Sequence, residues 1–491
     1  MKKTKVICSI GPACDCADVM GEMVKGGMDC ARINLSHATH EEIPKTIDVI
    51  RQARRQCNRP VAIMYDTKGP EFRTLTFKDG GVTLKKDDTI RMSKSCILGN
   101  EEEFGVNHSN AIDFIEVGDK VLIDNALFEL KVIDKKDDYV VLKASADGKI
   151  EDKKTINVPG VNLNLKFMSE VDKKDIAFAA KHACDYLALS FVNSKEDVAD
   201  ARKIIEDAGG DALIISKIES HMGIENIDEI IDESDGIMVA RGDLGVNVPL
   251  EELPILQKNI ITKCRQKGKF AIVATEMLAS MHENPRPTRA EVSDVANAIL
   301  DGTDCLMLSG ETTIGKHPVE SVEIMSKICR YVESTIDYTK HVAYKGTIGP
   351  SDTIAKLVVD AVEFSDIKLI VTTTLTGFTA RRISNFRPNS LIMACCPSNH
   401  IAEKVILNFG VKPVVTDIYE STDEMVDNAR KIAEMEFGLN KGDLIVVTGG
   451  FPLGQASKTN YLIIVEILNI SVMKKIVYNC NIFILYSIKL Y

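Results

Sequence analysis

The sequence predicts an α/β protein whose main part is a (β/α)8 TIM barrel, interrupted by an inserted all-β domain and followed by a C-terminal α/β domain. Three observations lead to this fold class. Short apolar runs alternate with segments of helical spacing through most of the first 336 residues, and eight such runs can be counted. Polar and charged residues follow these runs directly. The alternation stops only between about residues 75 and 165, where short strands are separated by polar turns.

The first 75 residues read as strand, helix, strand, helix and strand. The predicted strands are Val6–Ile10, Cys30–Leu35 and Val61–Tyr65, and the predicted helices are Asp18–Lys25 and Glu41–Gln56. Polar residues lie at the ends of the second and third strands: Arg32, Asn34, Ser36 and His37, then Asp66, Thr67, Lys68, Glu71 and Arg73. Arginine and lysine bind phosphate oxygens, whereas Asn, Ser, Asp and carbonyl oxygens suit a hard cation. These stretches indicate a metal-assisted phosphate site, and the alternative is an exposed ion-pair cluster.

The pattern changes between Leu75 and Leu165. Apolar and polar residues alternate there, as in KVLIDNALFELKVI and YVVLKAS, and polar turns separate the runs. No segment in this region has the length or the spacing of a helix. We therefore expect a small all-β domain inserted after the third barrel strand.

The alternation of strands and helices resumes after Met168. The predicted strands are Tyr186–Phe191, Leu213–Ser216, Ile237–Ala240, Phe270–Ala274 and Cys305–Leu308, and the predicted helices are Asp172–His182, Lys195–Ala208, Met222–Ile231, Leu253–Lys267, Arg289–Asp301 and Val319–Ile336. Four charged residues follow the second and third of these strands: Lys217, Glu219, Arg241 and Asp243. Ligands bind at the carboxyl ends of parallel barrel strands, so a lysine and two carboxylates at matching positions indicate a site. For any one of them, the alternative is a solvated loop charge.

A separate α/β unit begins at Ser351. Its predicted strands are Leu369–Thr373, Leu391–Ala394, Pro413–Val415 and Leu444–Thr448. The threonine-rich stretch Thr372–Thr379 precedes a predicted helix at Ala380–Asn385, and hydroxyls at a helix N-terminus are typical of an anion pocket. The alternative is that these threonines are only capping structure.

The tail Val472–Tyr491 is apolar but contains lysine and asparagine residues, and it falls short of the roughly 20 apolar residues that a membrane span needs. An extra strand, a docking segment and an altered reading frame all remain open for it.

The composition is that of an ordinary soluble globular protein, with 45% hydrophobic and 27% charged residues among 491. The net charge of −11 argues against general binding to nucleic acid or to an anionic membrane. The 13 cysteines include no C-x-x-C pair, so we expect most to be reduced and buried in a cytoplasmic protein. The N-terminal MKKTKVICSIGP is interpreted as a first strand and not as a signal peptide.

Eight motifs occur in one order along the chain: ICSIGPAC, ARINLSHATHEE, DTKGPEFRT, SKIES, MVARGDLG, ATEMLASM, NPRPTRAEVSDVANAILDGTDC and MLSGET. With them the sequence closely resembles the pyruvate kinase family, from Lys3 to about Glu466. The resemblance implies transfer of a phosphoryl group from phosphoenolpyruvate to ADP, giving pyruvate and ATP in the last step of glycolysis, with Mg²⁺ (or Mn²⁺) and K⁺ as cofactors.

The resemblance also implies roles for individual residues. Glu219 and Asp243 match the ligands of the divalent ion, and Lys217 matches the lysine beside the phosphoryl group and the developing enolate oxygen. Arg32 and Arg73 match the clamp on the phosphoryl charge, and Thr275 matches the threonine that delivers the proton through water. The backbone of Ala240, Arg241 and Gly242 would contact the substrate carboxylate, with Lys217, Asp243 and Thr275 completing the substrate site.

Further sites follow in the same way. Potassium would be bound by Asn34, Ser36, Asp66 and the carbonyl of Thr67, and Glu71 stands where potassium-dependent members carry glutamate. The nucleotide would be contacted by Arg73, His37, Lys174 and Asn34. A sugar-phosphate or nucleotide effector would bind Thr374, Thr376, Gly377 and Thr379, in the loop that faces 449–455. The chain departs from the family pattern at Glu276, often glutamine, and at Asp124-Asn125-Ala126, often Asp-Asp-Gly.

The resemblance divides the chain into a catalytic TIM barrel (residues 1–69 and 167–345), an inserted β-barrel lid domain (70–166), a C-terminal α/β regulatory domain (346–471) and a tail of unknown role (472–491). It implies a cytoplasmic homotetramer that binds neither nucleic acid nor membrane. Two other functions fit the residue pattern less well. A metal-dependent carbon–carbon lyase has no need of the phosphate-binding residues, and an inactive sensor would be expected to lack Lys217, Glu219, Asp243 or Thr275.

Overall fold

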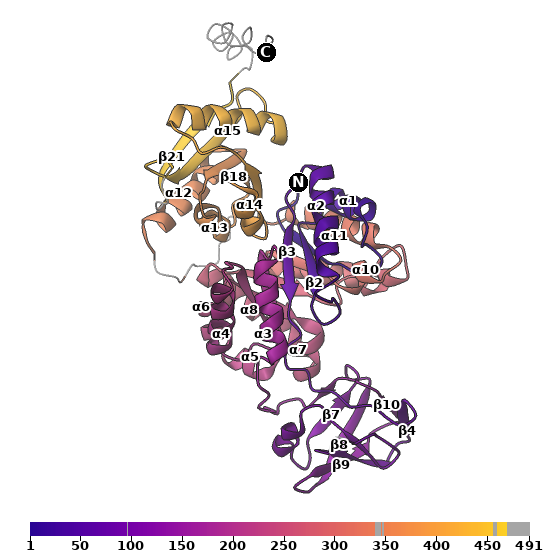
Figure 1. The fold of residues 1–491 in the computed structure, drawn as a ribbon. Coiled ribbons are helices and arrows are strands. Elements are labelled where there is room, and N and C mark those ends of the chain that lie inside the picture. The colour runs from indigo at the N-terminus through magenta and orange to yellow at the C-terminus, as the bar shows by residue number, and fades with distance from the viewer. Residues whose placement is uncertain (96, 339–344, 346–347, 455–458, 469–491) are drawn as a thin grey trace. The chain divides into compact units, whose positions relative to one another are not determined.

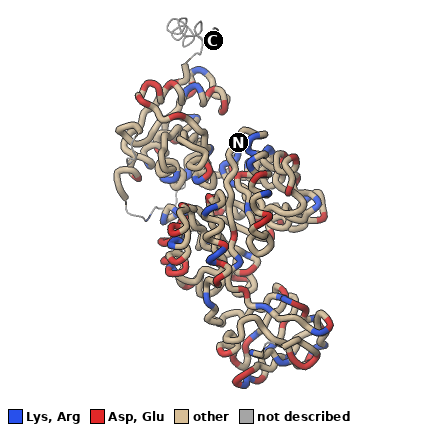
Figure 2. The backbone as a smooth tube through the Cα atoms, in the orientation of Figure 1, with Lys and Arg blue, Asp and Glu red and all other residues tan. Residues whose placement is uncertain are grey.

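The computed structural model describes residues 1–95, 97–338, 345, 348–454 and 459–468. The chain divides into two compact units, one containing residues 1–336 and the other the residues from 348 onward (Figure 1). Acidic and basic residues are interspersed in both units (Figure 2). None of the helices within the described residues has the length and apolar character needed to cross a membrane. The predicted tail Val472–Tyr491 lies outside the described residues.

Eight parallel strands of the first unit form a closed barrel, in the spatial order β1-β16-β15-β14-β13-β12-β3-β2. Their bounds are β1 (Lys5–Ser9), β2 (Cys30–Asn34), β3 (Ala62–Asp66), β12 (Tyr186–Leu189), β13 (Leu213–Ile218), β14 (Gly236–Ala240), β15 (Phe270–Ala274) and β16 (Cys305–Leu308). Almost every strand residue is buried, because parallel sheets are covered on both faces. The predicted TIM barrel is confirmed, with strands where all eight were expected.

Helices follow the barrel strands on the outside (Figure 1). Their bounds are α1 (Ala17–Gly26), α2 (Ile43–Cys57), α3 (Glu170–Lys181), α4 (Lys195–Asp207), α5 (His221–Glu225), α6 (Ile227–Glu233), α7 (Arg241–Asn247), α8 (Leu253–Lys267), η2 (Ala279–His282), α9 (Arg289–Asp301), α10 (Gly310–Thr313) and α11 (Pro318–Glu333). Capping boxes begin α3, α4 and α9, where a Ser or Thr and an acidic residue three positions later bond each other's backbone.

The predicted continuous helix Met222–Ile231 is wrong in one respect, since it is divided into α5 and α6 at Asn226. The backbone of Asn226 leaves the helical region, at φ −93° and ψ 13°, and its side-chain amide donates to the Asn193 carbonyl at 2.8 Å. Asparagine competes with helical backbone bonding in this way.

The inserted segment is all-β apart from one short 3-10 helix, η1 (Ser109–Phe114). Its strands are β4 (Gly81–Leu84), β5 (Thr89–Ser93), β6 (Glu103–Gly105), β7 (Lys120–Ile123), β8 (Phe128–Lys135), β9 (Tyr139–Ala144), β10 (Gly148–Glu151) and β11 (Ile156–Asn157). They form a six-stranded sheet, β11-β7-β8-β9-β5-β6, and a two-stranded sheet, β10-β4. The resemblance had indicated a β-barrel for this segment. Among the described residues the two sheets share one apolar core but do not close into a single barrel.

The second unit is a five-stranded sheet in the order β19-β18-β17-β20-β21, with helices between its strands. The bounds are α12 (Pro350–Ser365), β17 (Leu369–Thr373), α13 (Phe378–Asn385), β18 (Leu391–Cys396), α14 (Asn399–Val405), β19 (Val411–Val415), α15 (Thr422–Phe437), β20 (Leu444–Gly450) and β21 (Thr459–Glu466). The predicted α/β fold is confirmed. The antiparallel edge strand β21 was not predicted.

Candidate active site

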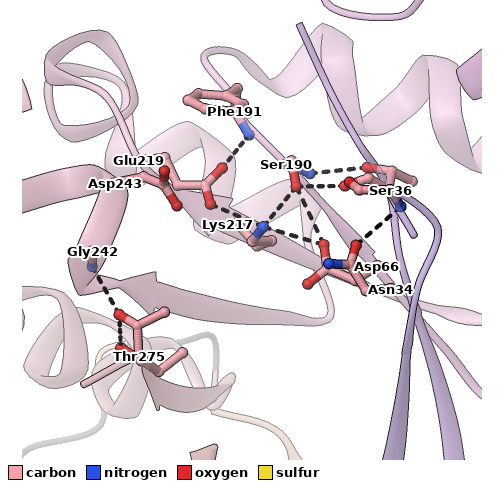
Figure 3. A network of polar contacts seen from close by, with 12 residues as sticks. Asn34, Ser36, Asp66, Ser190, Phe191, Lys217, Glu219, Gly242, Asp243 and Thr275 are labelled. Carbon is pink, nitrogen blue, oxygen red and sulfur yellow. Dashed lines mark hydrogen bonds and ion pairs between the residues drawn. The ribbon is translucent and has the colours of Figure 1, made fainter. Parts of the chain in front are cut away.

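Lys217 lies at the end of β13 and is the centre of a buried polar network (Figure 3). Its ammonium donates to the Ser190 hydroxyl at 2.6 Å and lies 2.9 Å from Glu219 Oε1 and 3.2 Å from Asp66 Oδ1. Burial opposes the charge of this group, but the two carboxylates raise the pKa of Lys217 above its ordinary value. The lysine is therefore a cation at neutral pH, in a place where water does not screen it.

Two carboxylates face a common space beside Lys217, one from Glu219 after β13 and one from Asp243 in α7 (Figure 3). Burial raises the pKa of Glu219 to about 7, and the charge of Asp243 adds to the rise while Lys217 opposes it. Glu219 Oε2 accepts from the Phe191 N–H at 2.7 Å, whereas Oε1 is buried without a hydrogen bond of good geometry. Two carboxyl groups that face one space suit a divalent cation, which would also offset the repulsion between them.

Arg32 and Asp66 form a second pair on the neighbouring strands β2 and β3. The Arg32 Nε donates to Asp66 Oδ2 at 2.7 Å, and its Nη1 donates to the Ser9 hydroxyl at 2.7 Å. Although burial alone would raise it, the pKa of Asp66 is lowered by Arg32 and Lys217. Asp66 is consequently ionised and shared between two cations.

The predicted potassium ligands come together at the ends of β2 and β3. Asn34 is opposite Asp66 in the strand register. The Asn34 side-chain oxygen accepts from the Ser36 N–H at 3.1 Å, and the Thr67 carbonyl accepts from the Ser190 hydroxyl at 2.7 Å. These residues present side-chain and carbonyl oxygens close to one carboxylate, a donor set that suits a monovalent hard cation.

Thr275 follows β15 in a strained turn. Thr275 and Glu276 have φ of +67° and +53°, a region that non-glycine residues rarely occupy. The Thr275 hydroxyl accepts from the Gly242 N–H at 2.8 Å and donates to the Ala274 carbonyl at 2.6 Å.

The guanidinium of Arg241 holds this turn in place. Its Nη2 donates to the Thr275 carbonyl at 2.8 Å and to the Glu276 carbonyl at 3.3 Å, while Nη1 pairs with Asp294 of α9 at 2.7 Å. The Arg241 side chain is thus engaged with the protein, and only its backbone is available to a substrate.

Three predicted residues lie outside the network around Lys217. Arg73 bonds both oxygens of Glu71, at 2.9 and 2.7 Å, and the Lys153 carbonyl at 2.6 Å. His37 and Lys174 are exposed, in the loop after β2 and in α3 respectively. Within the described residues, no contact joins these three side chains to Lys217.

Ser190 is part of the network around Lys217 and was not predicted. Its hydroxyl links Lys217 to Thr67 and lies 3.2 Å from Asp66 Oδ1, and its N–H donates to the Thr67 hydroxyl at 3.1 Å. Asn247, also not predicted, donates to the Glu219 carbonyl at 2.8 Å. Its position in the sequence could have indicated Ser190, because this residue directly follows barrel strand β12 at the edge where the other site residues lie.

The second unit contains a pocket of about 290 Å³ at the N-terminus of α13. Three of the predicted effector residues line it, Thr374, Thr376 and Thr379, while Gly377 caps α13 with φ +81°. Across the pocket are Thr416, Asp417 and Tyr419.

Comparisons with known proteins match the chain to one family. Residues 1–322 match the family described as "Pyruvate kinase, barrel domain", and residues 352–465 match "Pyruvate kinase, alpha/beta domain". A pyruvate kinase of Staphylococcus epidermidis is 41% identical over 467 residues, which cover 94% of this chain and 80% of the relative. One of Staphylococcus haemolyticus is 42% identical over 468 residues, with the same coverage.

A solved pyruvate kinase structure from Cryptosporidium parvum superposes with a TM-score of 0.90 at 37% identity, covering 95% of this chain and 96% of the other. Family descriptions, sequence relatives and a solved structure thus all point the same way. The chain belongs to the pyruvate kinase family.

Proposed function

We propose that the strand-end network around Lys217 transfers the phosphoryl group of phosphoenolpyruvate to ADP, giving pyruvate and ATP in the last step of glycolysis. The observation that carries the assignment to these residues is the buried lysine cation, held 2.9 and 3.2 Å from two carboxylates at the carboxyl end of the barrel strands. Membership of the pyruvate kinase family supplies the reaction.

In this reaction the bond between phosphorus and the enol oxygen breaks, and a bond from phosphorus to a terminal oxygen of ADP forms. Negative charge develops on the enol oxygen as the phosphoryl group leaves. Lys217 is placed to stabilise that oxygen and the phosphoryl group, and Arg32 adds a second fixed cation. Both are already oriented by Asp66, so little reorganisation is needed during the transfer.

Glu219 and Asp243 are the residues that would hold Mg²⁺ or Mn²⁺. No group of three or more His, Cys, Asp or Glu side chains suited to a metal occurs in the described part of the chain, so substrate and water oxygens would complete the coordination. A divalent ion bound there supplies charge neutralisation for the phosphoryl group. Asn34, Ser36, Asp66 and the Thr67 carbonyl would hold K⁺.

The enolate that remains must gain a proton at its methylene carbon. Thr275 is proposed to deliver this proton through a water molecule, with its hydroxyl oriented by Gly242. The backbone of Ala240, Arg241 and Gly242 at the start of α7 would bind the substrate carboxylate.

We also propose residues for the ADP site and the effector site, and an oligomeric state. Arg73, His37, Lys174 and Asn34 are proposed to contact ADP, with residues 70–166 acting as a lid. The pocket at Thr374, Thr376, Gly377 and Thr379 is proposed to bind a sugar-phosphate or nucleotide effector. A cytoplasmic homotetramer is the proposed form of the enzyme.

The proposal is tested by measuring pyruvate and ATP formation from phosphoenolpyruvate and ADP with magnesium, first with potassium and then with tetramethylammonium in its place. We expect both products in equal amounts, and only when both metal ions are present. Equal turnover in the two buffers would refute the potassium site, and a folded protein that forms neither product in either buffer would refute the reaction.

A further inference from the structure

Helix α3 contacts the two segments that follow β2 and β3, the strands at whose ends the proposed potassium ligands lie. Near the helix start, Asp172 Oδ1 accepts from the backbone N–H of Gly69 at 3.2 Å, just after β3. One turn later, Asp175 Oδ1 lies 2.8 Å from His40 Nε2, in the loop after β2. Residues three apart on a helix share one face, so the same face of α3 contacts the segments after β2 and β3.

The contacted segments continue directly from the proposed cation ligands. Asn34 and Ser36 lie a few residues before His40, and Asp66 and Thr67 lie just before Gly69. The β2–β3 register places Asn34 opposite Asp66, and α3 adds one contact to the segment after each strand. We call Asp172, Asp175 and His40 the α3 brace.

An aromatic stack fixes the position of His40. Its ring lies 4.0 Å from that of Phe178 with only 6° between the planes, and Phe178 in turn stacks on His182 at 3.9 Å. The His182 carbonyl accepts from the Tyr65 hydroxyl at 2.7 Å, which ties the end of the stack to β3 beside Asp66. The brace is therefore anchored to the strand that carries the ligands.

The Asp175 carboxylate is largely buried, whereas the His40 ring is partly exposed. The Asp175 side chain is 13% exposed and that of His40 is 38% exposed, in contrast to the exposed ion pair that Glu170 makes with Lys173 on the same helix. A partly buried pair with a stacked ring holds its two side chains in one arrangement, whereas an exposed ion pair contributes little to stability.

We infer that the α3 brace positions the monovalent-cation site, with Asp172, Asp175 and His40 acting as positioning residues that touch neither cation nor substrate. The inference rests on the proposed potassium site at Asn34, Ser36, Asp66 and Thr67. Cation ligands must be held to within a fraction of an ångström, and the groups that orient them are a usual means of doing so. Removing the Asp175–His40 contact leaves the four ligands in the protein but takes away the contact between α3 and the segment after β2, which carries Ser36.

The test compares Asp175→Ala and Asp175→Asn with Glu170→Gln, a matched change of an exposed acid on the same helix. Two quantities are measured for each protein: the potassium concentration that gives half-maximal activity, and the rise in melting temperature that potassium causes without substrates, relative to tetramethylammonium. We expect Asp175→Ala to raise the half-activating concentration about tenfold or more and to reduce the potassium-dependent rise, as loss of an orienting partner does at metal sites. Turnover at saturating potassium and the melting temperature without potassium should change little, and Glu170→Gln should behave as wild type.

The double variant His40→Ala with Asp175→Ala should lose no more potassium affinity than Asp175→Ala alone, because both changes remove one interaction. If the Asp175–His40 pair only stabilises the fold, both Asp175 variants would have a lower melting temperature without potassium and an unchanged half-activating potassium concentration. This result would overturn the inference. A wild-type protein that forms pyruvate without any response to potassium would refute the cation site, and the brace with it. A potassium response that all variants retain would refute the brace alone.

Discussion

Lys217 is buried at the end of β13, where a lone ammonium would lose its hydration without compensation. It remains charged because Asp66 and Glu219 lie within 3.2 Å and because the Ser190 hydroxyl accepts a hydrogen bond from its ammonium. Each of these partners also has a bond elsewhere in the protein, so the lysine is held in one position. Removing a single partner should therefore affect the chemistry more than the stability.

Ser190→Ala tests this expectation at the residue that was not predicted. The change removes the acceptor 2.6 Å from the Lys217 ammonium and the donor to the Thr67 carbonyl. Loss of a hydrogen bond to a buried charged group costs about 1.5–3 kcal/mol, so we expect kcat/KM to fall roughly 10- to 100-fold.

The matched control for this change is Ser216→Ala, which removes a buried serine whose hydroxyl bonds only Ser234, at 2.6 Å, in the same barrel. It should lower the melting temperature and leave kcat/KM near the wild-type value. Equal steady-state kinetics for the two variants would show that Ser190 has no role in the reaction.

The sequence was sufficient to predict those site residues that lie at or near the carboxyl ends of the barrel strands. Lys217, Glu219 and Asp66 lie at strand ends and Arg32 lies two residues before the end of β2. Their side chains do come together, while their chemical roles remain predictions. Ser190 was overlooked because serine at a strand end carries no charge to draw attention to it. The role of Arg241 side-chain bonds in holding Thr275 depends on a turn geometry that residue types alone do not reveal.

Among the elements, the barrel strands could be predicted because each is a short, fully buried apolar run, whereas other elements depend on longer-range contacts. The division of α5 from α6 depends on an Asn226 bond to Asn193, 33 residues away in sequence. The sheets of the inserted segment depend on pairings such as β5 with β9, which alternation of residue types does not specify.

The hairpin between β7 and β8 contains three consecutive non-glycine residues with positive φ. Asp124, Asn125 and Ala126 have φ of +54°, +55° and +64°, and Ala126 stands where the resemblance suggests glycine. An L-residue with a side chain at such φ costs roughly 1–2 kcal/mol, more than the roughly 0.4–1 kcal/mol that glycine loses through its freer unfolded chain. Ala126→Gly should therefore raise the free energy of unfolding slightly.

Chemical denaturation monitored by circular dichroism would measure this effect. Ala144→Gly, in the regular strand β9, is the appropriate comparison, and it should be destabilising because the strand needs no positive φ there. Destabilisation by Ala126→Gly to the same extent would mean that no strain is stored in this hairpin.

At the scale of the whole molecule, the buried thiols determine how stability responds to alkaline pH. Burial raises the pKa of eight cysteines, which are Cys8, Cys14, Cys30, Cys264, Cys305, Cys329, Cys395 and Cys396. In the unfolded chain these thiols ionise near their ordinary pKa, so their contribution to stability is present below that pKa and is lost as pH rises above it.

Three lysines act in the opposite direction. Burial lowers the pKa of Lys3 and of Lys5 to about 8 and also lowers the pKa of Lys269, so the cost of burying each charged lysine is removed as pH rises toward the ordinary lysine pKa. Each titrating group contributes up to about 1.4 kcal/mol per pH unit, so the eight thiols outweigh the three lysines. We expect the melting temperature to fall between pH 9 and pH 10.5 in the presence of a reducing agent, and a constant or rising value would contradict this balance.

We propose that the Lys217 cation stabilises the phosphoryl group and the enol oxygen during the transfer. The most direct test measures two properties of the Lys217→Met variant, its steady-state turnover and its affinity for Mn²⁺. Loss of one preorganised charge at a transition state typically costs about 100- to 1,000-fold in kcat, so we predict a fall of at least that size. Mn²⁺ affinity should be retained, since Glu219 and Asp243 are unchanged. Lys269→Met, which removes a half-buried lysine bonded at 2.5 Å to the Ser234 carbonyl, should keep full turnover. Wild-type turnover in a folded Lys217→Met protein would contradict the account.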